Sequence, residues 1–211
     1  MLLKNILALL VVIVFSASAS VNAASPKRNL LPAIEASEDG MYHQPWFYES
    51  FLDLKEDFTD SQKADKRLVI LFEQRGCPYC KETHHVNLRR PEITEYLKKN
   101  FNIIQMDLWG SREVTDFDGE KLPEKEFARK YGIQFTPTMI YFPDNLEKTK
   151  AKRPKDREVF RLFGYWKPFH FMNSFVYVKS AGYKKQPNFQ RWLSAHAEEL
   201  RKQGKDVSIW E

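Results

Sequence analysis

Two kinds of apolar pattern alternate along this chain. Short, continuously apolar runs are typical of buried β-strands, and apolar residues that recur every three or four positions are typical of helices lying on a sheet. The runs predict strands at 68–72, 101–108, 135–142 and 158–165. The helical spacing predicts helices that begin at 45 and cover 81–88, 91–99, 123–131, 168–181 and 187–203.

The first of these helices is predicted to start at Pro45, because proline suits the first turn of a helix. Phe47, Phe51, Leu54 and Phe58 would then form one apolar face. The order β-α-β-α-β-β-α, with early parallel crossovers and a late hairpin, predicts an α/β fold. We expect a central mixed sheet flanked by helices, with extra helices at both ends. An Asp-Gly turn inside 114–122 adds a short hairpin.

The first residues indicate an export signal. A cationic start containing Lys4 precedes an unbroken apolar run at 6–15, and Val21-Asn22-Ala23 follows as a small-residue cleavage site. The run is too short to cross a membrane as a helix, which takes about 20 residues. We therefore expect a signal peptide at 1–23, a flexible N-terminal arm at 24–44 and one domain at 45–211. A net charge of +5 over 211 residues indicates no particular partner.

The chain has two cysteines, Cys77 and Cys80, placed two residues apart. A disulfide between them would close a very small loop, which constrains an unfolded chain little, so a structural staple is a weak explanation. Cys77 falls where a predicted strand ends and a helix begins. Backbone N–H groups and the helix dipole at that place favour a thiolate, the form that attacks disulfides. Gly76 allows the tight approach of the chain, and Pro78 suits the first helical position.

One helical turn separates the two thiols and sets their expected roles. Cys77 is the candidate nucleophile, which forms a mixed disulfide with a partner protein. Cys80 lies nearer the core and is the candidate resolving thiol, which releases the partner. A C-x-x-C that joins a buried strand to a helix in a β-α-β pattern favours redox chemistry.

The segment Cys77–Cys80 after a buried strand, with Thr136 and Pro137 before a later strand, resembles the thioredoxin superfamily. The resemblance implies a thioredoxin-like fold in which Pro137 has a cis peptide bond and lies against the active-site sulfur. It also implies that the Thr136 backbone pairs with a substrate segment and that Pro78 and Tyr79 contact substrate.

A closer resemblance rests on two longer stretches, 109–120 and 165–171, which are similar to the exported thioredoxin-like proteins of sulfur-oxidation gene clusters, the SoxW type. It implies a periplasmic thiol–disulfide oxidoreductase that keeps the thiols of exported partner proteins reduced. A membrane electron donor that recycles the pair is a further expected partner. The chain has no room for a separate dimerisation domain, so we expect a monomer.

One position departs from thioredoxin. A buried aspartate stands six residues before the first cysteine there and accepts the proton of the resolving thiol, whereas this chain has Leu71. Glu73 lies on the same strand face and is the candidate replacement. The alternative is that Glu73 is only a polar residue at the end of a strand.

Other functions stay open as alternatives. Cys77, Cys80 and His84, with His85 beside it, could hold a soft metal, but adjacent histidines on a helix more often face solvent, and we expect no metal. The basic stretch from Lys148 to Arg157 contains no aromatic residues, so it indicates a solvated loop and no nucleic-acid site. No phosphate-binding loop or dinucleotide fingerprint occurs, so no cofactor is expected. A disulfide oxidase or isomerase and a non-catalytic peptide-binding module are the remaining alternatives.

Overall fold

The computed structural model describes residues 29–145, 147, 150–151, 153–205 and 207. The expected signal peptide at 1–23 lies outside these residues. Within them, every helix is too short or too polar to cross a bilayer.

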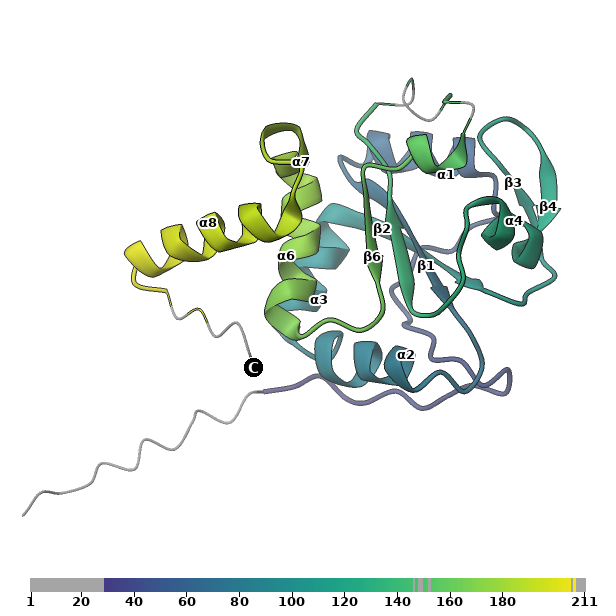
Figure 1. Ribbon diagram of the computed structural model, residues 1–211. Helices are drawn as coiled ribbons and strands as arrows, with labels where there is room; N and C mark the ends of the chain where they lie inside the picture. Colours follow the sequence, from purple (N-terminus) through teal and green to yellow (C-terminus); the bar gives the residue numbers. More distant parts are fainter. Residues whose placement is uncertain (1–28, 146, 148–149, 152, 206, 208–211) are drawn as a thin grey trace, which may run out of the picture.

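A four-stranded mixed sheet forms the centre of the molecule (Figure 1), as predicted. Its strands stand in the order β2 (Phe101–Asp107), β1 (Arg67–Glu73), β5 (Thr138–Tyr141) and β6 (Phe160–Phe163). β1 runs parallel to β2 and antiparallel to β5, and β5 pairs antiparallel with β6. The predicted short hairpin is β3 (Glu113–Thr115) and β4 (Lys121–Pro123).

Helices flank both faces of the sheet. They are α1 (Leu54–Lys63), α2 (Pro78–Glu82), α3 (Pro91–Asn100), α4 (Glu124–Lys130), α6 (Pro168–Lys179), α7 (Gly182–Lys185) and α8 (Phe189–Lys202). A π-helical turn (Thr83–Asn87) continues α2, and a 3-10 turn (Pro154–Asp156) precedes β6. The sequence pattern did not predict α7, which is a single turn between two predicted helices. α8 extends away from the sheet (Figure 1).

Successive side chains of β1 enter two separate cores, because side chains alternate across a strand. Ile70 and Phe72 pack with α1 and α4 on one face, and Val69 and Leu71 pack with α3 and α6 on the other. All four are fully buried. Burying one such side chain contributes roughly 1.5–3 kcal/mol, so β1 anchors the fold from both sides.

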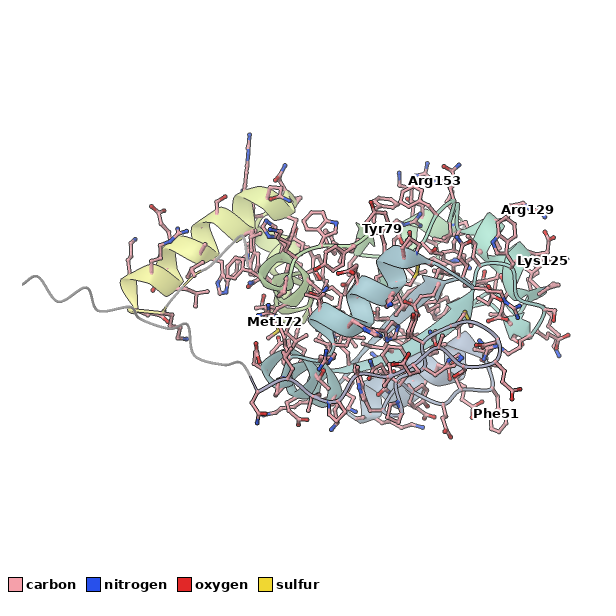
Figure 2. The ribbon with its side chains drawn as sticks, turned by 90° about the horizontal axis from the view of Figure 1, so that it is seen from below. Phe51, Tyr79, Lys125, Arg129, Arg153 and Met172 are labelled. Carbon is pink, nitrogen blue, oxygen red and sulfur yellow. A yellow bond between two sulfur atoms is a disulfide. The ribbon has the colours of Figure 1, made fainter. Side chains whose placement is uncertain are left out.

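The predicted helix start at Pro45 is wrong. The first helix, α1, begins at Leu54, and the Asp53 side chain caps it by accepting hydrogen bonds from backbone N–H groups of its first turn. Leu52 has a left-handed φ of 64°, which a continuous helix does not allow. Phe51, expected on the apolar face, is fully exposed and projects away from the body (Figure 2).

Residues 29–53, called here the N-terminal segment, are irregular but packed against the domain. The flexible arm expected at 24–44 stays a prediction, and its described part makes these contacts with the domain. Leu31 N–H donates to the Arg89 carbonyl at 2.7 Å, and Arg89 Nε donates back to the Leu31 carbonyl at 2.8 Å. Met41 is buried, and Gly40 accepts a hydrogen bond from Gly76 N–H, next to the cysteine pair. The segment runs along α2 in Figure 1.

The basic stretch is not wholly a solvated loop, because Arg157 is buried. Its guanidinium donates to Asp116 Oδ2 at 2.7 Å and to Asp118 Oδ2 at 2.8 Å, and Lys130 joins the same cluster. A charged side chain tolerates burial only when it is paired. Arg157 thus ties the segment before β6 to the turn of the β3–β4 hairpin.

Candidate active site

The two cysteines stand where β1 meets α2, and a disulfide joins them, with Cα atoms 5.2 Å apart. Cys77 is the cap residue before α2 and Cys80 lies in its first turn. Gly76 turns the chain here with a left-handed φ of 68°, which glycine adopts without strain. Both cysteines are buried, and Cys77, at 6% exposed against 2% for Cys80, is the more exposed residue of the two.

Two hydrogen-bond donors point at the sulfur of Cys77. The Cys80 backbone N–H donates to it at 3.1 Å, and Thr136 Oγ1 donates at 3.2 Å. Pro78 occupies the first helical position, where its missing N–H has no cost. Donors of this kind favour a charged sulfur over a neutral one, so the reduced pair would carry its negative charge on Cys77.

The loop before β5 lies against the disulfide. The Thr136–Pro137 peptide bond is cis, and both residues are buried. The Pro137 carbonyl accepts from Gly164 N–H at 2.8 Å, which ties this loop to the end of β6. In the described part of the chain, the backbone N–H and C=O of Thr136 have no hydrogen-bond partner. An extended peptide could pair with them next to the sulfur.

Exposed aromatic side chains surround the pair. Tyr79, between the cysteines, is 60% exposed on α2 (Figure 2). Trp109 donates from its indole to Gln74 Oε1 at 2.7 Å, and Phe135 contacts Phe163 with ring centroids 5.5 Å apart. Sequence reasoning did not single out Trp109, Phe135 or Phe163. No local pattern marks them, because what they share is exposure beside the same tertiary site.

Glu73, the candidate proton acceptor, is 1% exposed at the end of β1. His84 Nε2 lies 3.0 Å and 3.1 Å from its two carboxylate oxygens, and Gln105 Nε2 also donates to it. Leu71, at the position of the aspartate in thioredoxins, is fully buried in the apolar core. The structure thus supplies one buried carboxylate on this face, two residues further along the strand.

The sequence suggested that His84 lies on a solvated helix face, and this prediction is wrong. His84 is fully buried, and its two ring nitrogens face Glu73 and Gln44. His85, its neighbour, is half-buried and contacts the Ile34 carbonyl. Across the described residues, no three histidine, cysteine or acidic side chains are placed to bind a metal ion.

Residues 54–179 match the sequence model of a family described as a thioredoxin-like domain. No curated protein sequence matches the chain. Among solved structures, a thioredoxin-fold protein from Helicobacter pylori matches with a TM-score of 0.51 and 20% identity, covering 65% of this chain and 86% of that one. At this identity the likeness shows the fold alone.

Two further structures match less well. A thioredoxin from Thermus thermophilus has a TM-score of 0.44 and 22% identity, and the match covers 63% of this chain and 85% of that one. The oxidised C-terminal domain of DsbD from Neisseria meningitidis has a TM-score of 0.42 and 18% identity, covering 63% and 98%.

Proposed function

The chain belongs to the thioredoxin-like domain family, and we propose that it is a thiol–disulfide oxidoreductase that uses Cys77 and Cys80 on exported partner proteins. One observation carries this proposal. The sulfur of Cys77 receives two hydrogen bonds at the start of a helix, beside the unpaired backbone groups of Thr136. That arrangement activates a thiol and offers an edge for a peptide at the same point.

The proposed reaction has two steps. In the reduced protein, the Cys77 thiolate attacks a partner disulfide, forms a mixed disulfide and releases one partner sulfur as a thiolate. Cys80 then loses its proton and attacks the Cys77 sulfur, which forms the intramolecular disulfide and releases the second partner sulfur. Two electrons pass from the protein to its partner, and the two partner thiolates take up two protons. We assign acceptance of the Cys80 proton to Glu73.

The compartment and the direction of electron flow belong to the proposal as well. The predicted signal peptide at 1–23 and the resemblance to SoxW-type proteins support a periplasmic protein that reduces partners, with a membrane donor restoring its thiols. Exposed aromatic side chains around Cys77 suit a polypeptide partner better than a small, charged thiol.

Partner trapping tests the proposed chemistry. Cys80→Ser leaves the nucleophile without its resolving thiol, so mixed disulfides with exported proteins should accumulate. Cys77→Ser is the matched control and should trap none. If neither variant traps a partner, the redox function is refuted.

The reduction potential tests the direction separately. Thioredoxin-fold proteins span about −270 to −120 mV, from reductants to strong oxidants. Equilibration of the Cys77–Cys80 pair in a glutathione buffer should give a value in the lower half of that range. A value near the upper limit would make the protein an oxidant.

A further inference from the structure

A series of hydrogen-bonded side chains connects the N-terminal segment to Glu73; Trp46 and Gln44 are half-buried, and His84 and Glu73 are buried. Trp46 Nε1 donates to Gln44 Oε1 at 3.1 Å, and Gln44 Nε2 lies 3.1 Å from His84 Nδ1. His84 Nε2 lies 3.0 Å from Glu73 Oε2. The series thus runs from an irregular segment through the turn that follows α2 to the end of β1.

The hydrogen-bond partners of Gln44 and His84 determine which ring nitrogen of His84 carries the proton. The indole N–H of Trp46 can only donate, so the oxygen of the Gln44 amide faces it and the NH₂ group faces His84. An NH₂ group also only donates, so Nδ1 of His84 must accept. The proton of the neutral imidazole therefore sits on Nε2, where it is donated to Glu73.

A second donor reaches the same carboxylate from β2. The Gln105 NH₂ group donates to Glu73 Oε2 and to the Tyr42 carbonyl, the latter at 2.8 Å. The N-terminal segment thereby orients both donors of Glu73: Gln44 orients His84, and the Tyr42 carbonyl orients Gln105. A buried carboxylate stays ionised only when such donors replace water.

The spacing along α2 and the π-helical turn relates His84 to Cys80. Cys80 and His84 are four residues apart, a spacing that places side chains on one face of a helix, and both are buried. Helical side chains lean toward the N-terminus of their helix, so the His84 ring reaches back over the turn that contains Cys80. His84, which holds the Glu73 carboxylate, thus shares a buried helical face with the resolving thiol.

We propose that the N-terminal segment is a working part of the redox centre: Gln44 fixes the tautomer of His84, and His84 and Gln105 hold the Glu73 carboxylate ready to take the Cys80 proton. This rests on the proposed function. In the step, the Cys80 S–H bond breaks and its proton binds to a Glu73 oxygen. The new thiolate attacks Cys77, and the partner sulfur leaves with the bonding electrons. Glu73 then releases the proton to water.

A route to water exists on the side of the N-terminal segment. A cavity of about 680 Å³ lies between that segment and β2, and His43, Gln44 and Gln105 are among its lining residues. Water needs only about 10–15 Å³ of such space per molecule. The titratable and charged groups around the Glu73–His84 pair, directly or through Gln105, include Cys80, Tyr42, Asp107, His43, Asp39 and Arg112, whose guanidinium donates to the Gln105 carbonyl at 2.9 Å.

Nitrogen-15 NMR of the His84 ring tests the tautomer. The native oxidised protein at neutral pH should show a neutral ring with its proton on Nε2. Gln44→Glu keeps the side-chain shape but places a carboxylate oxygen against Nδ1, so that variant should show a doubly protonated ring. A native ring with its proton on Nδ1 would overturn the proposal.

The rate of the second exchange step tests whether Gln44, His84 and Glu73 assist removal of the Cys80 proton. The reduced protein is mixed with an aromatic disulfide that releases one coloured thiolate when Cys77 attacks and a second when Cys80 attacks. Glu73→Gln, His84→Gln and Gln44→Glu should each slow the second release about tenfold or more at neutral pH. In Glu73→Gln the second rate should also rise about tenfold for each pH unit, because hydroxide must then remove the proton.

His85→Gln is the matched control, because it removes the adjacent ring and its contact to Ile34 without touching Glu73. Its second release should stay within about twofold of the native rate, well inside the general-base effect. Equal pH profiles in all variants, or equal slowing by His85→Gln, would refute the proposal. A native protein that releases no coloured thiolate at all would refute the proposed function instead. If Glu73→Gln or His84→Gln does not fold, Gln44→Glu still tests the proposal.

Discussion

Replacing Thr136 with valine isolates one hydrogen bond to the reactive sulfur. The variant keeps the branched side chain and loses the hydroxyl that donates to Cys77 Sγ at 3.2 Å. A hydrogen bond to a charged group contributes about 1.5–3 kcal/mol, and sulfur is a weak acceptor, so we take the lower end. A loss of about 1.4 kcal/mol lowers the ratio of thiolate to thiol tenfold at a given pH. The pKa of the Cys77 thiol should therefore rise in the reduced variant.

Ultraviolet absorbance of the thiolate during a pH titration measures this effect. The titration is made in a Cys80→Ser background, so that Cys77 is the only thiol. Thr138→Val is the matched control, because the Thr138 hydroxyl donates to the Phe135 carbonyl at 2.8 Å and does not contact the sulfur. It should lower stability by about 1 kcal/mol and leave the Cys77 titration unchanged. If Thr136→Val titrates like the parent, the hydroxyl does not stabilise the thiolate and our explanation of the activated sulfur is wrong.

Three further predictions concern stability, each measured by urea unfolding. Desolvation raises the pKa of Asp57 to about 6, so the folded state holds a proton that the unfolded chain releases, and stability falls as pH rises from about 4 to about 6. Asp57→Asn should add about 2 kcal/mol at neutral pH, and an equal gain near pH 4 would contradict this explanation. Arg157→Ala leaves Asp116 buried and should cost about 3 kcal/mol, and a change under about 0.5 kcal/mol would show that Lys130 suffices. Phe51→Ala should change stability by under about 0.5 kcal/mol, because Phe51 is exposed. A loss of about 3 kcal/mol would instead indicate a buried Phe51 and support the helix predicted from residue 45.

Apolar runs predicted the sheet because β1, β2 and β5 are largely buried on both faces. The run at 68–72 became β1 within one residue at each end, and that at 101–108 became β2. The two later strands are shorter than predicted, since the runs 135–142 and 158–165 include residues outside the ladder. Pro137 cannot donate to a neighbouring strand, and Gly164 has a left-handed φ of 70°. The apolar runs thus extend past the paired residues at the ends of both strands.

The error at residue 45 has a different cause. Phe47 and Leu54 have helical spacing, but they pack in different cores. Phe47 packs against the core that α3 and α6 cover, and Leu54 lies in the core that α1 and α4 cover. A spacing pattern assumes that all apolar residues face one surface. The N-terminal segment instead crosses the edge of the sheet at β2, where Tyr48 N–H donates to the Ile103 carbonyl at 2.9 Å, and so contacts both cores.

The candidate site shows the same limit more sharply. The position of Cys77 and Cys80 between a strand and a helix could be predicted because it is local, and the roles assigned to them stay predictions. The partners of Glu73 could not be predicted, since they lie 11 and 32 residues away in sequence. A carboxylate at the end of a buried strand must find donors, because burial without them costs several kcal/mol. Adjacent residues on a helix point about 100° apart, so only one of the two histidines after Cys80 could turn fully toward the core. The sequence therefore indicated that Glu73 needs a hydrogen-bond donor and that His84 or His85 could supply it. Only the fold shows that the donor is His84.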